Sequence, residues 1–97
     1  MSKIYSMLGI ARKGGKLSIG YDAACFEIRN NKSKLILISI DASEKTKKNI
    51  QYECNKYGVN SIEFGEKELI GKYLGKKVVS VLSINDENIV DYILNNI

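Results

Sequence analysis

The sequence predicts an α/β fold: a three-layer α/β/α sandwich with a four-stranded mixed, largely parallel sheet. Predicted helices alternate with predicted strands along the whole chain, which is the pattern of layered α/β folds. The segment 34–40 (KLILISI) is apolar on both sides, which is typical of a central strand covered on both faces. The 97 residues can bury one core and no linker or repeat interrupts them, so we expect a single domain over residues 1–97.

Hydrophobic spacing organises the first half of the chain. Ile4, Leu8 and Ala11 recur at helical intervals and predict a helix over residues 3–12, which a Gly-Gly pair ends. The elements that follow are a short strand at 17–19, a helix at about 20–31 and the strand at 34–40.

Capping residues organise the second half. A helix is predicted over residues 43–57, because Asp41 or Ser43 can cap its start and Gly58 can end it. A second apolar run, 77–84 (KVVSVLSI), predicts another buried strand. The remaining elements are a strand at 61–64, a helix at 66–74 and a last helix at 87–96.

Two predicted helices begin near the carboxyl ends of predicted strands. One begins at residues 20–22 (GYD) and the other at residues 41–44 (DASE). In open α/β sheets this edge is where ligands bind, so we expect the binding site there.

Charge is distributed unevenly along the sequence. Residues 1–40 carry seven Lys or Arg against two acids, whereas residues 78–97 carry no basic residue and three acids. A basic region of this kind favours a partner rich in phosphate, and a lysine-rich surface that only confers solubility remains the alternative.

The residue types exclude several classes of protein. The chain has no histidine, which removes the commonest general base and metal ligand, so we expect no catalytic residue, no metal and no cofactor. Cys25 and Cys54 fall within predicted helices without a C-x-x-C spacing, which indicates free thiols. No apolar run approaches the ~20 residues that span a bilayer, and a signal peptide is not indicated, so we expect a cytoplasmic protein without membrane contact.

Five segments, taken in order, resemble the kink-turn-binding ribosomal protein superfamily, and most closely its small bacterial ribosomal-protein-like paralogues. The segments are residues 8–16 (LGIARKGGK), 15–20 (GKLSIG), 32–38 (KSKLILI), 41–43 (DAS) and 69–76 (LIGKYLGK). The resemblance covers nearly the whole chain.

The resemblance implies a non-catalytic RNA-binding protein of translation that recognises kinked or internally looped structured RNA, with ribosomal RNA as the expected target. It implies a partner in the ribosome or another ribonucleoprotein, and no DNA. The start of the second helix would enter the RNA major groove at the kink. A helix N-terminus suits phosphate, and Gly20 would let the backbone approach the ligand.

The residues expected to contact RNA come from four parts of the chain. Lys13 and Lys16 would hold phosphates from the glycine-rich loop, and Tyr21 would stack on a flipped base. Arg29 would supply a cation that the family usually carries at the position of Phe26. The full set is Arg12, Lys13, Lys16, Gly20, Tyr21, Asp22, Arg29, Lys45 and Asn85.

Departures from the family pattern leave a second interpretation open. Where family RNA binders carry polar or basic residues after the glycine, this chain has Tyr21, Asp22, Ala23 and Phe26. RNA specificity therefore differs here, or the chain is a protein–protein adapter of the same fold with weakened RNA specificity. An RNA methyltransferase fragment and a thiol enzyme are less favoured, because there is no room for a catalytic domain and no histidine to activate a thiol.

Overall fold

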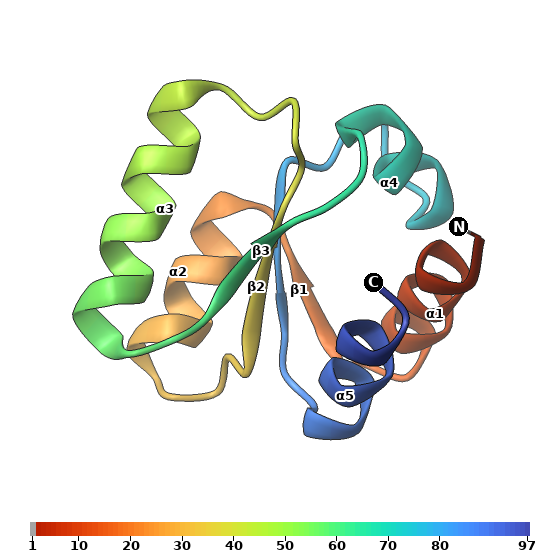
Figure 1. Cartoon of the computed structure of the whole chain (residues 1–97), viewed down its shortest axis with the longest axis horizontal. Helices are drawn as coiled ribbons and strands as arrows, with labels where there is room; N and C mark the ends of the chain where they lie inside the picture. Colours follow the sequence, from red (N-terminus) through yellow and green to blue (C-terminus); the bar gives the residue numbers. More distant parts are fainter. Residues whose placement is uncertain (1) are drawn as a thin grey trace.

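A computed structural model describes residues 2–97 and contains nine elements that match the predicted types in the predicted order (Figure 1). The helices are α1 (Ser2–Lys13), α2 (Tyr21–Arg29), α3 (Glu44–Tyr57), α4 (Lys67–Tyr73) and α5 (Glu87–Asn95). The strands are β1 (Leu17–Ile19), β2 (Leu35–Ile38), β3 (Ser61–Glu63) and β4 (Val81–Ile84). No helix within residues 2–97 combines the length and the apolar character that crossing a membrane requires.

The last strand begins later than predicted, at Val81 instead of residue 77. The backbone N–H of Lys76 donates to the Gly71 carbonyl, and that of Val79 donates to the Lys67 carbonyl. These bonds hold the first apolar residues of the run against α4, and so the segment cannot pair within the sheet.

The sheet is mixed, with the strand order β1-β4-β2-β3. The β2–β3 pairing is parallel, whereas β4 lies between β1 and β2 and pairs antiparallel with both. The prediction of a mixed sheet is confirmed, but the prediction that it is largely parallel is wrong. The difference comes from β4. The alternation of helices and strands predicted that this strand belongs to the sheet, but it did not predict the direction in which the strand runs.

Helices cover both faces of the sheet and give the predicted sandwich (Figure 1). On β2, Leu35 and Leu37 face the layer formed by α1, α4 and α5, whereas Ile36 and Ile38 face α2 and α3. All four residues are buried, which explains why this strand is apolar throughout.

Capping side chains fix where the helices start. Ser43 caps α3 by accepting a hydrogen bond from the Thr46 backbone N–H, and Gly58 ends this helix with a left-handed conformation. Asp41, the other predicted cap for α3, instead accepts from the backbone N–H of Lys67 at the start of α4. Its carboxylate therefore connects the β2–α3 loop to α4.

Candidate functional site

One end of the sheet gathers the starts of three helices, and we call it the helix-start end. The strand register pairs Ile19 with Leu82 and Ile38 with both Val81 and Glu63. The carboxyl ends of β1, β2 and β3 therefore meet at this end, next to the first residue of β4. The segments that form it are residue 20, residues 40–43, residues 65–67 and residues 76–80.

The start of α2 is exposed at the helix-start end. Gly20 precedes this helix with φ 106° and ψ 161°, and it provides no side-chain cap for the first turn. The Gly20 N–H donates to the Val81 carbonyl, which fixes the start of α2 beside β4. A Cβ added at Gly20 would meet no atom within 4 Å. The first turn of α2, whose N–H groups carry the positive end of the helix dipole, is exposed at Tyr21 and Asp22.

The loop of residues 76–80, which is not among the predicted contacts, also lies at this end. Residues 76–80 connect α4 to β4 and lead directly to Val81, which is hydrogen-bonded to Gly20. Lys76, Lys77 and Val78 are exposed on it. The loop packs closely on α4, because a Cβ at Gly71 would lie 2.9 Å from the carbonyl oxygens of both lysines. No local sequence pattern predicts that this loop lies at the same end of the sheet as Gly20, because that depends on the direction of β4.

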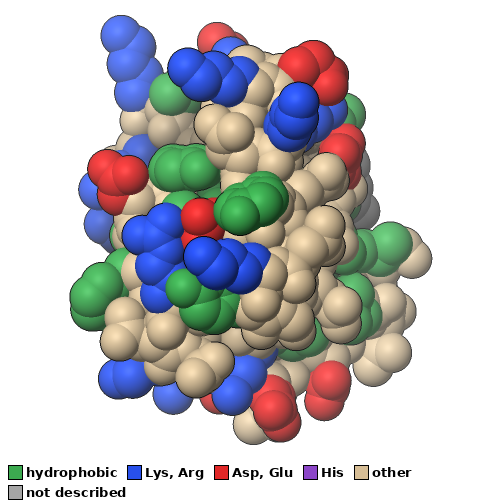
Figure 2. All heavy atoms as spheres, turned by 90° about the vertical axis from the view of Figure 1, so that its left-hand side faces the viewer, with side chains coloured by type: hydrophobic (Ala, Val, Ile, Leu, Met, Phe, Trp, Pro, Cys, Tyr) green, Lys and Arg blue, Asp and Glu red, His purple; other side chains and the backbone are tan. Residues whose placement is uncertain are grey.

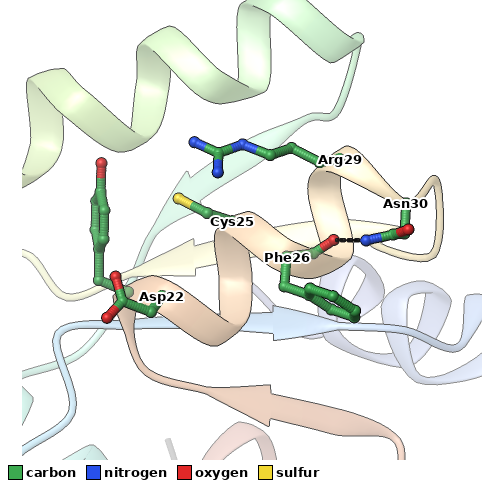
Figure 3. A pocket seen from close by; sticks show the side chains of 6 residues that line it. Asp22, Cys25, Phe26, Arg29 and Asn30 are labelled. Atoms are coloured by element: carbon green, nitrogen blue, oxygen red, sulfur yellow. Dashed lines mark hydrogen bonds between the residues drawn. The ribbon is translucent and has the colours of Figure 1, made fainter.

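The outer surface of α2 carries a hollow of about 350 Å³ whose lining runs from the first turn of the helix to its last (Figure 3). The sequence predicted a role for three of its lining residues but missed the other three. The lining consists of Tyr21, Asp22, Cys25, Phe26, Arg29 and Asn30. Their spacing, two residues per helical turn, is the signal that would have grouped them on one face of α2.

Aromatic side chains remain unusually exposed on the α2 and α3 side of the molecule. The exposed fractions are 63% for Phe26, 37% for Tyr21 and 64% for Tyr52. In the view onto this side, hydrophobic side chains lie at the surface between Lys and Arg side chains (Figure 2). Rings are therefore available for stacking beside basic groups.

Arg29 is engaged by a carboxylate on the neighbouring helix. Its guanidinium bonds both carboxylate oxygens of Glu53 on α3, with Nε 3.1 Å from Oε1 and one terminal nitrogen 3.0 Å from Oε2. This bond lowers the pKa of Glu53 below its ordinary value, so the charge of Arg29 is balanced at neutral pH. The cation that was predicted to replace a family lysine is thus partly used within the fold.

The two thiols are buried and suited to packing. Cys25 and Cys54 are both free and belong to the core between the sheet and the helices α2 and α3. Burial raises the pKa of Cys54 to about 11 and raises that of Cys25 as well. Both are therefore protonated at neutral pH and poor nucleophiles. Within residues 2–97 no three His, Cys, Asp or Glu side chains form a group that could hold a metal ion.

The opposite end of the sheet, which we call the Asn85 end, holds the remaining predicted contacts. The Asn85 backbone N–H donates to the Lys16 carbonyl, and its side-chain amide lies within hydrogen-bond distance of Ser18 and Ser83. Because these polar atoms serve the fold, we do not include Asn85 in a ligand site. Lys13 and Lys16 are exposed here, at the start of β1.

The two remaining predicted basic contacts are Arg12, beside the start of the loop 76–80, and Lys45 on α3. The Arg12 guanidinium lies close to Gly75. A Cβ added at that glycine would stand 3.9 Å from the nearest guanidinium atoms. Lys45 is exposed in the first turn of α3. The structure thus brings Arg29 together with Tyr21 and Asp22, next to Gly20. Lys13, Lys16 and Asn85 lie at the opposite end of the sheet.

Comparison with known proteins gives one consistent family. The model of the ribosomal protein L7Ae/L30e/S12e/Gadd45 family matches residues 2–92. The RNA-binding protein YlxQ of Bacillus subtilis is 30% identical over 91 residues, which cover 94% of this chain and 91% of that protein. The large ribosomal subunit protein eL30 of Saccharomyces cerevisiae is 32% identical, over 90% of this chain and 88% of that protein.

Solved structures share the fold. A protein of unknown function from Bacillus halodurans superposes with a TM-score of 0.86 at 25% identity, over 96% of this chain and 98% of that one. The 15.5kD RNA binding protein of Giardia lamblia superposes with a TM-score of 0.80 at 19% identity, over 95% of this chain and 82% of that one.

Proposed function

Because the chain belongs to the ribosomal protein L7Ae/L30e/S12e/Gadd45 family, we propose that it binds structured RNA without catalysing a reaction. Its relatives include proteins named as RNA-binding and as ribosomal, which supports this assignment. The observation that carries the proposal is the exposed start of α2 at Gly20, with the lysine-bearing loop 76–80 beside it.

The geometry suits a kinked or internally looped RNA. The first-turn N–H groups of α2 offer positive potential, and glycine lets a ligand approach the backbone. An ordinary A-form major groove is too narrow for a helix, whereas a kink opens it. Lys76 and Lys77 would contact phosphates on either side of the kink. We therefore propose a kink-turn or a looped segment of ribosomal RNA as the target.

The loop between α1 and β1, which carries Lys13 and Lys16 at the Asn85 end, would extend the proposed RNA-binding surface. Lys16 and Gly20 are separated by β1, an edge strand of three residues that spans about 10 Å. An RNA helix docked at the start of α2 can therefore also reach Lys13 and Lys16. The ribosomal relatives support a partner in the ribosome or another ribonucleoprotein, and we therefore expect the protein in the cytoplasm.

Equilibrium binding to a labelled kink-turn RNA and to a plain duplex of equal length, at several salt concentrations, tests the proposal. We expect tighter binding to the kink-turn at every salt concentration, and a steep loss of affinity for both as salt rises. Gly20→Ala should weaken kink-turn binding by roughly tenfold, because it adds a methyl group where the backbone would meet RNA and strains a backbone with φ 106°. Thermal unfolding checks that the variant folds. Gly58→Ala, at a positive φ beyond the end of α3, is the matched control.

Two outcomes would contradict the proposal. Equal affinity for both RNAs would mean a basic protein without kink-turn recognition. Absence of binding at moderate salt would remove RNA as the ligand and favour the protein–protein adapter, for which the exposed Phe26 would be the first surface to examine.

A further inference from the structure

A row of exposed side chains runs along the outer face of α3 at intervals of three or four residues. This outer row consists of Lys45, Lys48, Tyr52 and Lys56. Residues at these intervals share one face of a helix, and the row lies opposite the buried Ile50 and Cys54. We propose that the outer row binds a single-stranded segment of the RNA whose structured part docks at the start of α2. This inference rests on the proposed function, because the docked RNA brings the single strand to α3.

The aromatic member of the row is available for stacking. Tyr52 is 64% exposed, more than any other aromatic side chain within residues 2–97. In the view onto the side of the molecule that includes α3, hydrophobic side chains lie between Lys and Arg side chains (Figure 2). A ring of this kind contributes little to the core, whereas a base can stack on it without any rearrangement of the fold.

The lysines of α3 divide into one that serves the fold and three that do not. Lys47, on the inner side, donates to the Ile40 carbonyl at 2.8 Å and lies 3.3 Å from a carboxylate oxygen of Glu63. No lysine of the outer row has a carboxylate oxygen within 4.0 Å in the part of the chain that the structure describes. The row therefore presents three ammonium groups to solvent, where they can hold phosphates.

The two acidic residues of α3 lie away from the middle of the row. Glu53 is on the side of α2, where both of its carboxylate oxygens are bonded to Arg29. Glu44 is the first residue of the helix, where it complements the helix dipole. Basic side chains on both sides of an exposed ring are typical of surfaces that bind single-stranded nucleic acid. An acidic protein would use the lysines but would leave the ring of Tyr52 without a partner, so RNA is favoured.

The position of α3 connects the outer row to the proposed RNA-binding surface. The helices α2 and α3 both start at the helix-start end, and they lie side by side (Figure 1). The row extends from Lys45 in the first turn to Lys56 in the last, a span of about 17 Å at roughly 1.5 Å per residue. This span corresponds to about five nucleotides at roughly 3.4 Å each. A strand that leaves an RNA docked at Gly20 can therefore follow α3 from its start.

The experiment uses the full chain, a kink-turn RNA, and the same RNA extended at its 5′ or its 3′ end by about ten unpaired adenosines, twice the span of the row. We expect one of the two extensions to tighten wild-type binding by roughly 5- to 100-fold, the range for one stacked base. Tyr52→Ala should remove this gain and bind the unextended RNA as the wild type does. Phe26→Ala, which removes an equally exposed ring from α2, should keep the gain.

A pair of lysine variants tests the phosphate contacts. Lys48→Gln combined with Lys56→Gln should reduce the gain and should lower the slope of log affinity against log salt for the extended RNA by about 1.4, the value for two contacts to a single strand. Lys3→Gln combined with Lys32→Gln is the matched control, because it removes the same charge from exposed positions on α1 and before β2. This control should keep both the gain and the slope. Thermal unfolding checks that every variant folds.

Fluorescence reports stacking at the row directly. The chain contains no tryptophan, so Tyr52→Trp introduces a single indole on the outer face of α3. The extended RNA should quench this fluorescence more strongly than the unextended RNA does. Phe26→Trp, which places the indole on α2, should show equal quenching by the two RNAs.

The outcomes separate this inference from the proposed function. If the wild type prefers the kink-turn but neither extension adds affinity, the single-strand site is refuted, an acidic protein becomes the favoured partner of the row, and the proposed function stands. A gain that survives Tyr52→Ala would place the extension elsewhere and also refute the site. An equal loss of gain in the Lys3 and Lys32 control would reduce the effect to net charge and refute it too. A wild type without kink-turn preference would refute the proposed function, and this inference with it.

Discussion

The two ends of the sheet differ in how many of their polar groups are hydrogen-bonded by side chains of the protein. At the Asn85 end, side chains from β1, β4, α2 and the loop before β2 bond one another inside the fold. At the helix-start end, α2 and α4 begin at Gly20 and Glu66, and neither residue caps its own helix with a side chain. The first end is closed by its own side-chain hydrogen bonds. At the second, Ser43 caps α3 and Asp41 accepts from the Lys67 N–H of α4, whereas the start of α2 at Gly20 has no side-chain cap.

In the hydrogen-bond network at the Asn85 end, the chemistry of the groups decides which one donates to which. The Ser83 hydroxyl lies 2.7 Å from Oγ of Ser33 and 2.6 Å from Oδ1 of Asn85. An amide oxygen only accepts, so the single hydrogen of Ser83 goes to Asn85 and Ser33 donates to Ser83. The Asn85 amide then donates to Ser18, and Ser18 donates to a carboxylate oxygen of Glu27. Each member supports the next, which strengthens the whole chain.

The largest effect should come from crowding the helix-start end. Gly71→Ala would place a Cβ 2.9 Å from the carbonyl oxygens of Lys76 and Lys77, which are rigid backbone atoms. We expect a loss of about 1–3 kcal/mol in the free energy of unfolding, measured by urea titration, together with weaker kink-turn binding as the loop shifts.

Gly9→Ala is the matched control for this variant. Gly9 also lies in a helix, but its Cβ would stand at an ordinary contact distance, 3.4 Å, from the Tyr73 carbonyl oxygen. This variant should retain or slightly increase stability. Unchanged RNA affinity in a destabilised Gly71→Ala variant would show that the loop 76–80 is not part of the interface.

A smaller effect, on stability alone, is expected at the Asn85 end. Ser83 is fully buried, and Ser83→Ala would leave Asn85 without a donor and Ser33 without an acceptor. We expect a loss of about 1–2 kcal/mol in the free energy of unfolding and no change in RNA affinity. Ser6→Ala, at an exposed position on α1, controls for loss of a hydroxyl. Reduced RNA affinity in folded Ser83→Ala would contradict the view that this end only serves the fold.

Local sequence patterns predicted the elements, but they could not assign residues to the two ends. Apolar spacing and caps placed every helix and strand, because periodicity of 3.6 or 2 is a local property. The direction of β4 depends instead on pairing with β1 and β2, which are distant in sequence. For this reason Asn85 was grouped with Gly20 although it lies at the opposite end. The loop 76–80 was not grouped with Gly20, although it leads into Val81, whose carbonyl accepts from the Gly20 N–H.

The smallest predicted effect concerns how α4 is capped at the helix-start end. Oδ1 of Asp41 accepts from the Lys67 backbone N–H at 3.0 Å, and this bond holds the pKa of Asp41 below its ordinary value. A carboxyl group with a depressed pKa in the folded state stabilises the fold above the unfolded pKa of about 3.9. That stabilisation is lost as the pH falls through the lower folded value.

Asp41→Asn keeps an acceptor oxygen but removes the charge, and so isolates this contribution. The stability difference between wild type and variant should be constant from neutral pH to about pH 5, and should shrink as the pH falls below about 4. Urea unfolding at a series of pH values measures it, and Asp91→Asn on α5 removes the same charge away from α4 as a control for net charge. Curves that stay parallel down to pH 3 would show that the carboxylate of Asp41 does not stabilise α4. Ser43 would then be the side chain that caps a helix at this end, since Gly20 and Glu66 do not cap theirs, and the contrast with the hydrogen-bonded Asn85 end would be sharper still.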